Sequence, residues 1–297
     1  MRVIVRSVLC AGLVAAGTAC DRGGGEPSRV RTVGGFRTPE SVKWYEAQDV
    51  YLVSNINGNP GEKDNNGSIS RMMANGSVEY QFIAGGKNGV TLNAPKGMAL
   101  VGDTLWVADI DEVRVFHAST GAPLGTVGIP GSLFLNDVVA APDGALYISD
   151  TGIRIGAGGI EHPGPDRIYR IARDRQVSVA LEGHMLNGPN GVAWDRDGDR
   201  LVVVSFAGNS LLSWKPGDTG PAVIGTGAGQ FDGVEVVDGA VWVSSWADSS
   251  VYRYAGGEGT KLIKGVPTPA DIGYDAKRNR LLVPSFAGNT VEVWQLR

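Results

Sequence analysis

Polar side chains recur at one position of a pattern that repeats six times along the chain. When the repeats are aligned on their first predicted strand, this position holds Glu40, Lys96, Asn136, Asn190, Asp232 and Ala270. Carboxylate and amide oxygens are the ligands that a hard cation such as Ca²⁺ prefers, and asparagine coordinates without adding charge. The pattern favours a divalent metal site, with Ca²⁺ as the expected ion and Glu40, Asn136, Asn190 and Asp232 as its ligands. The alternative is that these residues only cap turns between repeats.

Further polar residues should surround this site. Asp137 and Asp271 follow two of the six positions directly and add negative potential. Four residues near the ends of second strands are predicted to stand behind the ligands or to line a pocket: Asn55, Asn57, Asp109 and Asp150.

Two insertions, Asn55 to Gly67 and Thr151 to Asp166, lengthen the connection between second and third strands. In an up-and-down sheet this connection lies on the same face as the start of the first strand. Both insertions are therefore predicted to wall the metal site, although loops of this length can also be disordered decoration.

The elements that position these residues are short strands. Residues 191 to 217 read as an alternating strand, an Asp-Gly turn, an apolar strand, a loop and a third strand, and residues 271 to 296 repeat that order. A fourth, less regular strand follows most third strands, as at 77 to 83 and 177 to 181. Four antiparallel strands in roughly 40 residues form a propeller blade, so we predict an all-β, six-bladed β-propeller over residues 29–297.

The two ends of the propeller should meet in one blade. The sixth repeat stops after its third strand at Leu296, and Arg29 to Val33 has strand character. We expect this N-terminal strand to complete the last blade, because such closure hides the sheet edges. Asn75-Gly76, Asp143-Gly144, Asp197-Gly198 and Asp238-Gly239 are predicted to form type I′ hairpin turns.

An export signal is predicted over residues 1–20. Arg2 and Arg6 precede an apolar stretch that is too short to span a membrane as a stable helix. Small residues before Cys20 resemble a bacterial lipoprotein signal, with plain secretion as the alternative. Residues 21–28 form a flexible linker, and the chain would be periplasmic or attached to the cell envelope, touching membrane only through a lipid on Cys20.

Composition and residue types exclude several functions. The net charge of −4 comes from interspersed charges, so nucleic acid is not an expected partner. The three histidines, His117, His162 and His184, have no metal-ligand spacing and are assigned to loops or the surface. Phe206, Trp246 and Phe286 follow second strands on the predicted channel face, where they either pack between blades or line a pocket.

These motifs resemble the senescence-marker-protein/gluconolactonase/luciferin-regenerating-enzyme-like family, and more distantly diisopropylfluorophosphatase and paraoxonase. The resemblance covers roughly residues 37 to 296. It implies a six-bladed propeller with a divalent ion held by a first-blade Glu, middle-blade Asn residues and an Asp. Glu40 in TPESVKW, Asn136 in LNDV, Asn190 in GPNGVAWD and Asp232 in FDGVEV match that order. The family's usual Gly/Ser-Pro pair does not follow Glu40, since Pro39 precedes it.

The resemblance implies an exported, Ca²⁺-dependent hydrolase of lactonase or esterase type acting on a small molecule. It gives Asp232 the role of base or nucleophile, and Lys96 is placed to stabilise developing oxyanion charge. The alternative is a non-catalytic propeller that binds a ligand or a protein, with a structural ion. We expect a monomer in either case.

Overall fold

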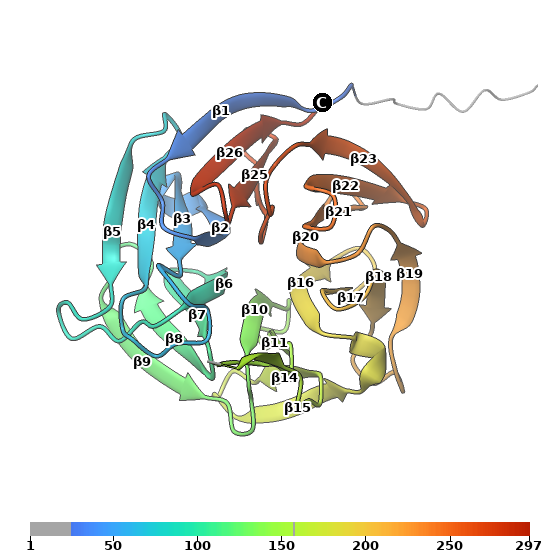
Figure 1. Ribbon diagram of the computed structural model, residues 1–297, viewed down its shortest axis with the longest axis horizontal. Helices are drawn as coiled ribbons and strands as arrows, with labels where there is room; N and C mark the ends of the chain where they lie inside the picture. The colour runs from blue at the N-terminus through green and yellow to red at the C-terminus, as the bar shows by residue number, and fades with distance from the viewer. Residues whose placement is uncertain (1–24, 157) are drawn as a thin grey trace, which may run out of the picture.

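Six four-stranded antiparallel sheets surround a central channel in the computed structural model, which describes residues 25–156 and 158–297 (Figure 1). The predicted all-β, six-bladed propeller is confirmed. Among the described residues, helix is limited to two short 3-10 segments, Glu46–Gln48 and His184–Leu186. No helix in the described ranges has the length and apolar character needed to cross a membrane. The predicted export signal and Cys20 lie outside the described residues.

Each blade runs outward from the channel in chain order, except the last. The first three blades are β2 (Pro39–Tyr45), β3 (Val50–Asn55), β4 (Ser68–Met73) and β5 (Val78–Ala84); β6 (Pro95–Val101), β7 (Thr104–Asp109), β8 (Glu112–His117) and β9 (Pro123–Gly128); and β10 (Leu135–Ala140), β11 (Leu146–Asp150), β14 (Arg167–Ile171) and β15 (Val177–Glu182). The fourth and fifth are β16 (Pro189–Asp195), β17 (Arg200–Ser205), β18 (Ser210–Trp214) and β19 (Ala222–Thr226); and β20 (Phe231–Val237), β21 (Ala240–Ser245), β22 (Ser250–Ala255) and β23 (Glu258–Lys264).

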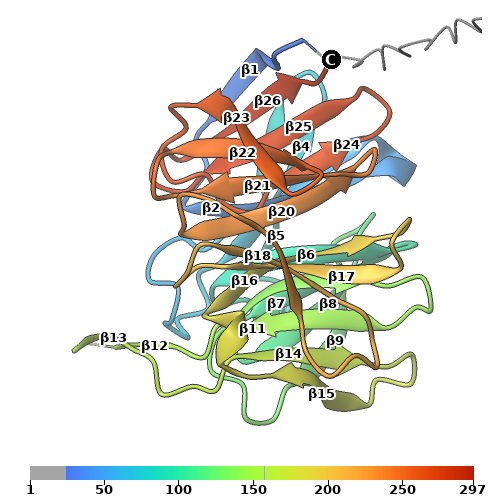
Figure 2. The same ribbon diagram turned by 90° about the vertical axis from the view of Figure 1, so that its right-hand side faces the viewer.

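The sixth blade joins both ends of the described chain. It contains β24 (Gly273–Asp275), β25 (Arg280–Ser285), β26 (Thr290–Gln295) and the N-terminal β1 (Ser28–Gly34). Strand β1 pairs antiparallel with β26 from Ser28 opposite Gln295 to Gly34 opposite Thr290, as Figures 1 and 2 show at the edge of the ring. The predicted closure is confirmed, and the strand begins one residue earlier than expected.

The hydrophobic core is divided among the six blade interfaces. Successive side chains of a strand point to opposite faces of its sheet. Apolar side chains on each face of a blade therefore pack against the neighbouring blade on that side. The interface between the first and last blades, for example, buries Val42, Tyr51 and Met72 against Leu282 and Val291. Tyr51 also donates a 2.6 Å hydrogen bond to Asp275 across that interface. This packing fixes the blades around the channel.

The turn prediction was wrong in part. Only Asp238 and Gly239 both have positive φ, as a type I′ turn requires. At Asn75-Gly76 and Asp143-Gly144 only the glycine is left-handed, and its N–H bonds the carbonyl three residues back, at Met73 and Ala141. These hairpins therefore use a longer loop with a terminal left-handed glycine, which the Asx-Gly pair alone does not distinguish.

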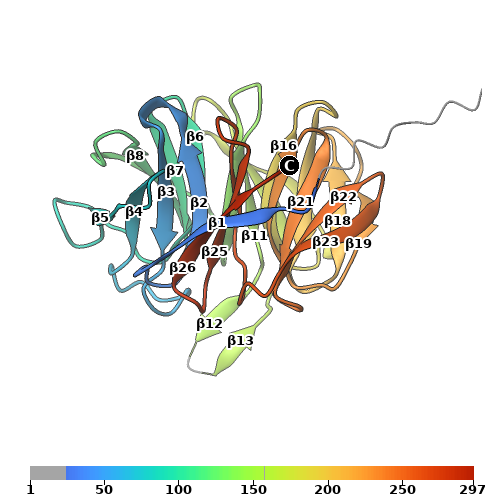
Figure 3. The same cartoon turned by 90° about the horizontal axis from the view of Figure 1, so that it is seen from above.

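Both predicted insertions are present on one face. The second contains a hairpin that the sequence analysis missed, β12 (Arg154–Gly156) with β13 (Gly159–Glu161). Figure 3 shows this hairpin projecting from the ring. The two insertions meet, since a Cβ on Gly61 would lie 2.9 Å from the Cβ of Ile155. They form one continuous wall across the first three blades.

Candidate metal centre and active site

Five of the six aligned positions lie at irregular points of the innermost strands, and the sixth, Ala270, precedes β24. In each of the first five blades, pairing with the second strand shifts register around the aligned residue, as between Pro39 and Val42 or between Phe231 and Val234. Two residues on the inner strand there oppose one on its partner, which is a β-bulge. Because a bulge bends its strand and re-aims side chains, it explains how consecutive residues can reach the channel.

Close contact between blades accompanies these bulges. A Cβ on Gly97 would lie 2.0 Å from Oδ1 of Asp137, and one on Gly191 would lie 2.3 Å from the Asp232 carbonyl. No side chain fits at either position. Glycine therefore allows neighbouring inner strands to approach each other closely beside Asp137 and Asp232.

Three of the four predicted ligands bury an oxygen without a hydrogen-bond partner. These atoms are Oε2 of Glu40, Oδ1 of Asn190 and Oδ1 of Asp232, on side chains that are 3% to 5% exposed. Buried polar atoms are nearly always paired, and an orphaned one costs about 1–3 kcal/mol. A bound cation would satisfy all three oxygens at once.

The fourth predicted ligand, Asn136, is oriented by its neighbours. Its amide Nδ2 donates to the Thr151 hydroxyl at 3.1 Å, and that hydroxyl donates to the Pro189 carbonyl at 2.9 Å. With the amide nitrogen held in this way, the carbonyl oxygen of Asn136 is its remaining polar atom. Thr151 begins the second insertion, so that loop helps to position a ligand.

Burial and mutual repulsion oppose ionisation of the carboxylates. Desolvation, reinforced by the charges of Asp232, Asp271 and Asp137, raises the pKa of Glu40 well above its usual range. Desolvation, followed by the charges of Asp271 and Asp137, likewise raises the pKa of Asp232. Carboxylates gathered in a dry channel are stable as anions only with a nearby cation. The electrostatics therefore fit the same divalent ion as the unpaired oxygens.

Lys96 supplies one positive charge beside this cluster. Its side chain is 1% exposed, its ammonium donates to the Ala94 carbonyl at 3.2 Å, and it lies 4.1 Å from the centre of the Phe134 ring. Burial lowers the pKa of Lys96 to about 8, while the charges of Glu40 and Asp109 act in the opposite direction. Lys96 is thus a buried amine close to Glu40, one of the candidate metal ligands. A group that stabilises an oxyanion at this site would have to lie in such a position.

A second charged layer lies one to three residues further along the inner strands. Lys43 forms ion pairs with Asp271 at 3.2 Å and Glu235 at 3.3 Å, joining the first, fifth and sixth blades. Asp271 also accepts a 2.5 Å hydrogen bond from the Ser41 hydroxyl. Asp137 accepts hydrogen bonds from the backbone N–H groups of Val138 and Val192. Asp137 and Asp271 are thus engaged beneath the candidate metal ligands.

Three of the predicted surrounding residues hold the loops that enter the inner strands. Asn55 accepts from the N–H of Arg37, Asp109 from the N–H groups of Asn93 and Ala94, and Asp150 from those of Leu133 and Phe134. In the other blades Ser205, Ser245 and Ser285 donate to the equivalent loops. The residue ending each second strand therefore anchors the loop that precedes the aligned position of its own blade.

The fourth of these residues, Asn57, donates its amide to the Asn66 carbonyl within the first insertion. Asn55 and Asn57 also line a separate cavity of about 440 Å³ at the edge of the first blade, beside Arg37 and Tyr80. They shape the loop and this cavity.

One pair near the site was missed by sequence reasoning. His162 Nε2 lies 2.6 Å from Oδ1 of the buried Asp166, whose other oxygen accepts from the N–H of Gly188. A Cβ on Gly152 would lie 3.0 Å from this imidazole. His162 therefore lies beside Gly152, which directly follows Thr151. The only sequence signal was a His and an Asp four residues apart in an insertion.

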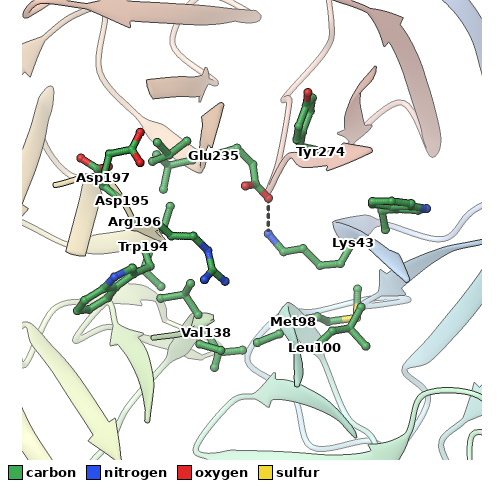
Figure 4. Close-up of a pocket in the computed structure, with 18 of the residues that line it drawn as sticks. Lys43, Met98, Leu100, Val138, Trp194, Asp195, Arg196, Asp197, Glu235 and Tyr274 are labelled. Atoms are coloured by element: carbon green, nitrogen blue, oxygen red, sulfur yellow. Dashed lines mark hydrogen bonds and ion pairs between the residues drawn. The ribbon is translucent and has the colours of Figure 1, made fainter. Parts of the chain in front are cut away.

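A larger cavity opens at the other end of the channel. Its volume is about 550 Å³, and it is lined by later residues of the inner strands and by hairpin residues, including Arg196, Asp197 and Asp238. Figure 4 shows Lys43 and Glu235 pointing toward each other across it, with Arg196 directed toward its centre. Since each inner strand runs from the ligand end to its hairpin, the Lys43 ion pairs lie between this cavity and the candidate metal ligands.

The candidate metal site would need both carboxylate and amide ligands. Among the residues that the structure describes, no group of three or more histidine, cysteine or acidic side chains is placed to hold a metal. A metal at Glu40 and Asp232 would therefore depend on Asn136 and Asn190 as well. Such an all-oxygen set suits Ca²⁺ rather than zinc.

Comparisons with known proteins agree with this architecture. A Xanthomonas campestris gluconolactonase superposes with a TM-score of 0.68 at 18% identity, covering 92% of this chain and 95% of its own. A luciferin-regenerating enzyme gives 0.68 at 13% identity, covering 91% and 95%. A chain of a nidogen/laminin complex gives 0.62 at 17% identity, covering 76% and 80%. These identities are low, so the superpositions support the fold.

A comparison with curated proteins gives no match. The model of the SMP-30/gluconolactonase/LRE-like region matches residues 38–273, which include all four candidate ligands and five complete inner strands. The chain therefore belongs to the SMP-30/gluconolactonase/LRE-like family.

Proposed function

We propose that this protein is an exported, Ca²⁺-dependent hydrolase of lactonase or esterase type. The observation that carries the proposal is the set of three unpaired buried oxygens on Glu40, Asn190 and Asp232. Family membership favours lactone hydrolysis, in which water adds to the carbonyl and the ring C–O bond breaks to give a hydroxy acid. Export rests on the predicted leader alone.

Glu40, Asn136, Asn190 and Asp232 would hold the ion, which when bound would supply Lewis acidity to a carbonyl or phosphoryl oxygen. Asp232 has a buried, unpaired carboxylate oxygen, which suits a group that accepts a proton. The indole N–H of Trp246 faces this carboxylate and favours its anion, although it falls short of a hydrogen bond. Lys96 is placed to offset negative charge beside Glu40.

A second candidate function is ligand or protein binding without catalysis. It is favoured by the likeness to a chain of a nidogen/laminin complex, in which a similar fold occurs within a protein–protein complex. The two candidates differ in whether a substrate reaches Asp232.

The deciding experiment uses protein from Cys20 onward, stripped with chelator and titrated with Ca²⁺ by calorimetry. The same samples are then assayed on lactones, aryl esters and phosphotriesters. Saturable Ca²⁺ binding with chelator-sensitive turnover supports the hydrolase. Binding without turnover on the whole panel supports the second candidate, and absence of any Ca²⁺ heat or thermal shift overturns the metal site.

A further inference from the structure

An apolar band borders the candidate metal site on one side. The residue after the second strand is aromatic in the last three blades, at Phe206, Trp246 and Phe286. Trp246 meets Phe206 edge to face at a centroid distance of 5.3 Å and Phe286 at 5.2 Å. All three side chains are partly exposed. Each residue of this band therefore keeps part of its surface exposed.

This band reaches the candidate ligands directly. The backbone N–H of Trp246 donates to the Gln230 carbonyl at 3.0 Å, two residues before Asp232, which places the middle of the band beside the proposed catalytic group. At its far end Phe286 packs against Ile56, Ala94 and Ile110, which belong to the first two blades. Apolar packing therefore continues from the fourth blade around to the second, where Ile56, Ala94 and Ile110 are themselves buried.

The polar groups on the opposite wall are largely engaged with each other. Asn57 donates to the Asn66 carbonyl, Asp64 accepts from Asn66, and Asn65 accepts from the N–H of Leu92. Lys63 pairs with Asp111 at 2.6 Å, and His162 contacts Asp166. These contacts hold the insertions in place. Apart from Asn66 Oδ1, which has no hydrogen-bond partner, these described groups are already paired, so they are less available to replace the water around a polyhydroxylated substrate, whose hydroxyls would be costly to desolvate unpaired.

We propose that the site selects lactones or esters that carry an alkyl or aryl group, and discriminates against polyhydroxylated lactones. This inference rests on the proposed hydrolase function and adds the substrate class. Removing apolar surface from water against Phe206, Trp246 and Phe286 would provide the selectivity, at about fourfold in affinity for each fully buried methylene.

The test measures kcat/KM of the Ca²⁺-loaded protein on δ-valerolactone, δ-octalactone, δ-decalactone and δ-gluconolactone. We expect a rise of about two- to fourfold per added methylene until the band is covered, with δ-gluconolactone at or below δ-valerolactone. A second readout is independent of turnover, because calorimetry compares binding of octanoate, hexanoate and gluconate. Octanoate should bind at least tenfold more tightly than gluconate.

Phe206→Ala and Phe286→Ala should each flatten the chain-length dependence. The matched control is Phe82→Ala, because Phe82 is partly buried but lies elsewhere, under Arg71 at 4.2 Å. Melting temperatures of all variants show which remain folded, and Phe206→Ala alone suffices if Phe286→Ala does not fold.

The outcomes separate the two proposals. The substrate class is overturned, while the hydrolase stands, if δ-gluconolactone is turned over as well as δ-decalactone. It is also overturned if the dependence of kcat/KM on chain length is unchanged in both Phe206→Ala and Phe286→Ala. If no substrate is hydrolysed but octanoate binds through Phe206, the hydrolase falls and selection for apolar ligands stands.

Discussion

Glu40→Gln should change the stability of this protein in opposite directions with and without Ca²⁺. Glu40 is 5% exposed, and its pKa is raised by desolvation and by three neighbouring carboxylates. Glutamine keeps the shape and one amide oxygen but removes the charge. In the metal-free protein the substitution therefore relieves repulsion, whereas in the Ca²⁺-loaded protein it removes a charged ligand.

The magnitudes follow from burial. An uncompensated buried charge costs several kcal/mol, and a buried amide without partners costs about 1–3 kcal/mol, so the metal-free variant should gain roughly 1–2 kcal/mol. At about 2–4 °C per kcal/mol for a domain near this size, Tm rises by about 2–8 °C. Ca²⁺ at 100 times Kd should add about 2.7 kcal/mol to the wild type, or roughly 5–10 °C, and far less to the variant.

Thermal melts of wild type and Glu40→Gln, each with chelator and with Ca²⁺ at 100 times the wild-type Kd, measure both effects. The control is Glu79→Gln, because Glu79 is half exposed and pairs with Arg71 at the surface, so its loss should matter by less than about 0.5 kcal/mol. A Ca²⁺ shift in Glu40→Gln as large as in wild type would refute Glu40 as a ligand. A lower Tm for the metal-free variant would refute the repulsion argument.

Asp232→Asn should lower Ca²⁺ affinity moderately and reduce turnover at saturating Ca²⁺ by about 10²- to 10⁴-fold, as steady-state assays would show; near-normal turnover would move the catalytic role to another group. Asn190→Ala should weaken Ca²⁺ binding, measured by calorimetry, with activity partly restored by excess Ca²⁺. Since the raised pKa values of Glu40 and Asp232 make the folded state hold protons that the unfolded state has lost, metal-free protein should gain stability as pH falls from 7.5 to 5.5. Melts at both pH values test this, and Glu40→Gln should show a smaller gain. Deleting residues 28–34 should lower Tm far more than deleting 21–27, because only the first removes the strand paired with β26; equal losses would contradict the closure.

The blades were predictable because strand signals are local. Alternation of apolar residues marks each strand, and the recurrence of Ser-Phe-Ala-Gly-Asn at 205–209 and 285–289 aligns distant repeats. The incomplete sixth repeat and the spare N-terminal strand implied that they pair, and the structure has that pairing. The turn types were less predictable, because an Asx-Gly pair fits hairpin loops of more than one length.

Sequence alignment of the repeats also identified the ring of candidate ligands, since equivalent residues in equivalent blades must lie around one axis. It could not show that Glu40, Asn190 and Asp232 leave buried oxygens unpaired, because that depends on which neighbouring blades supply hydrogen bonds. It missed the contact of His162 with Asp166 and the cavity opposite the candidate metal ligands. Local periodicity thus determines the blades and their order, whereas the inward aim of each side chain is decided by β-bulges and close blade contacts that form only when the ring closes.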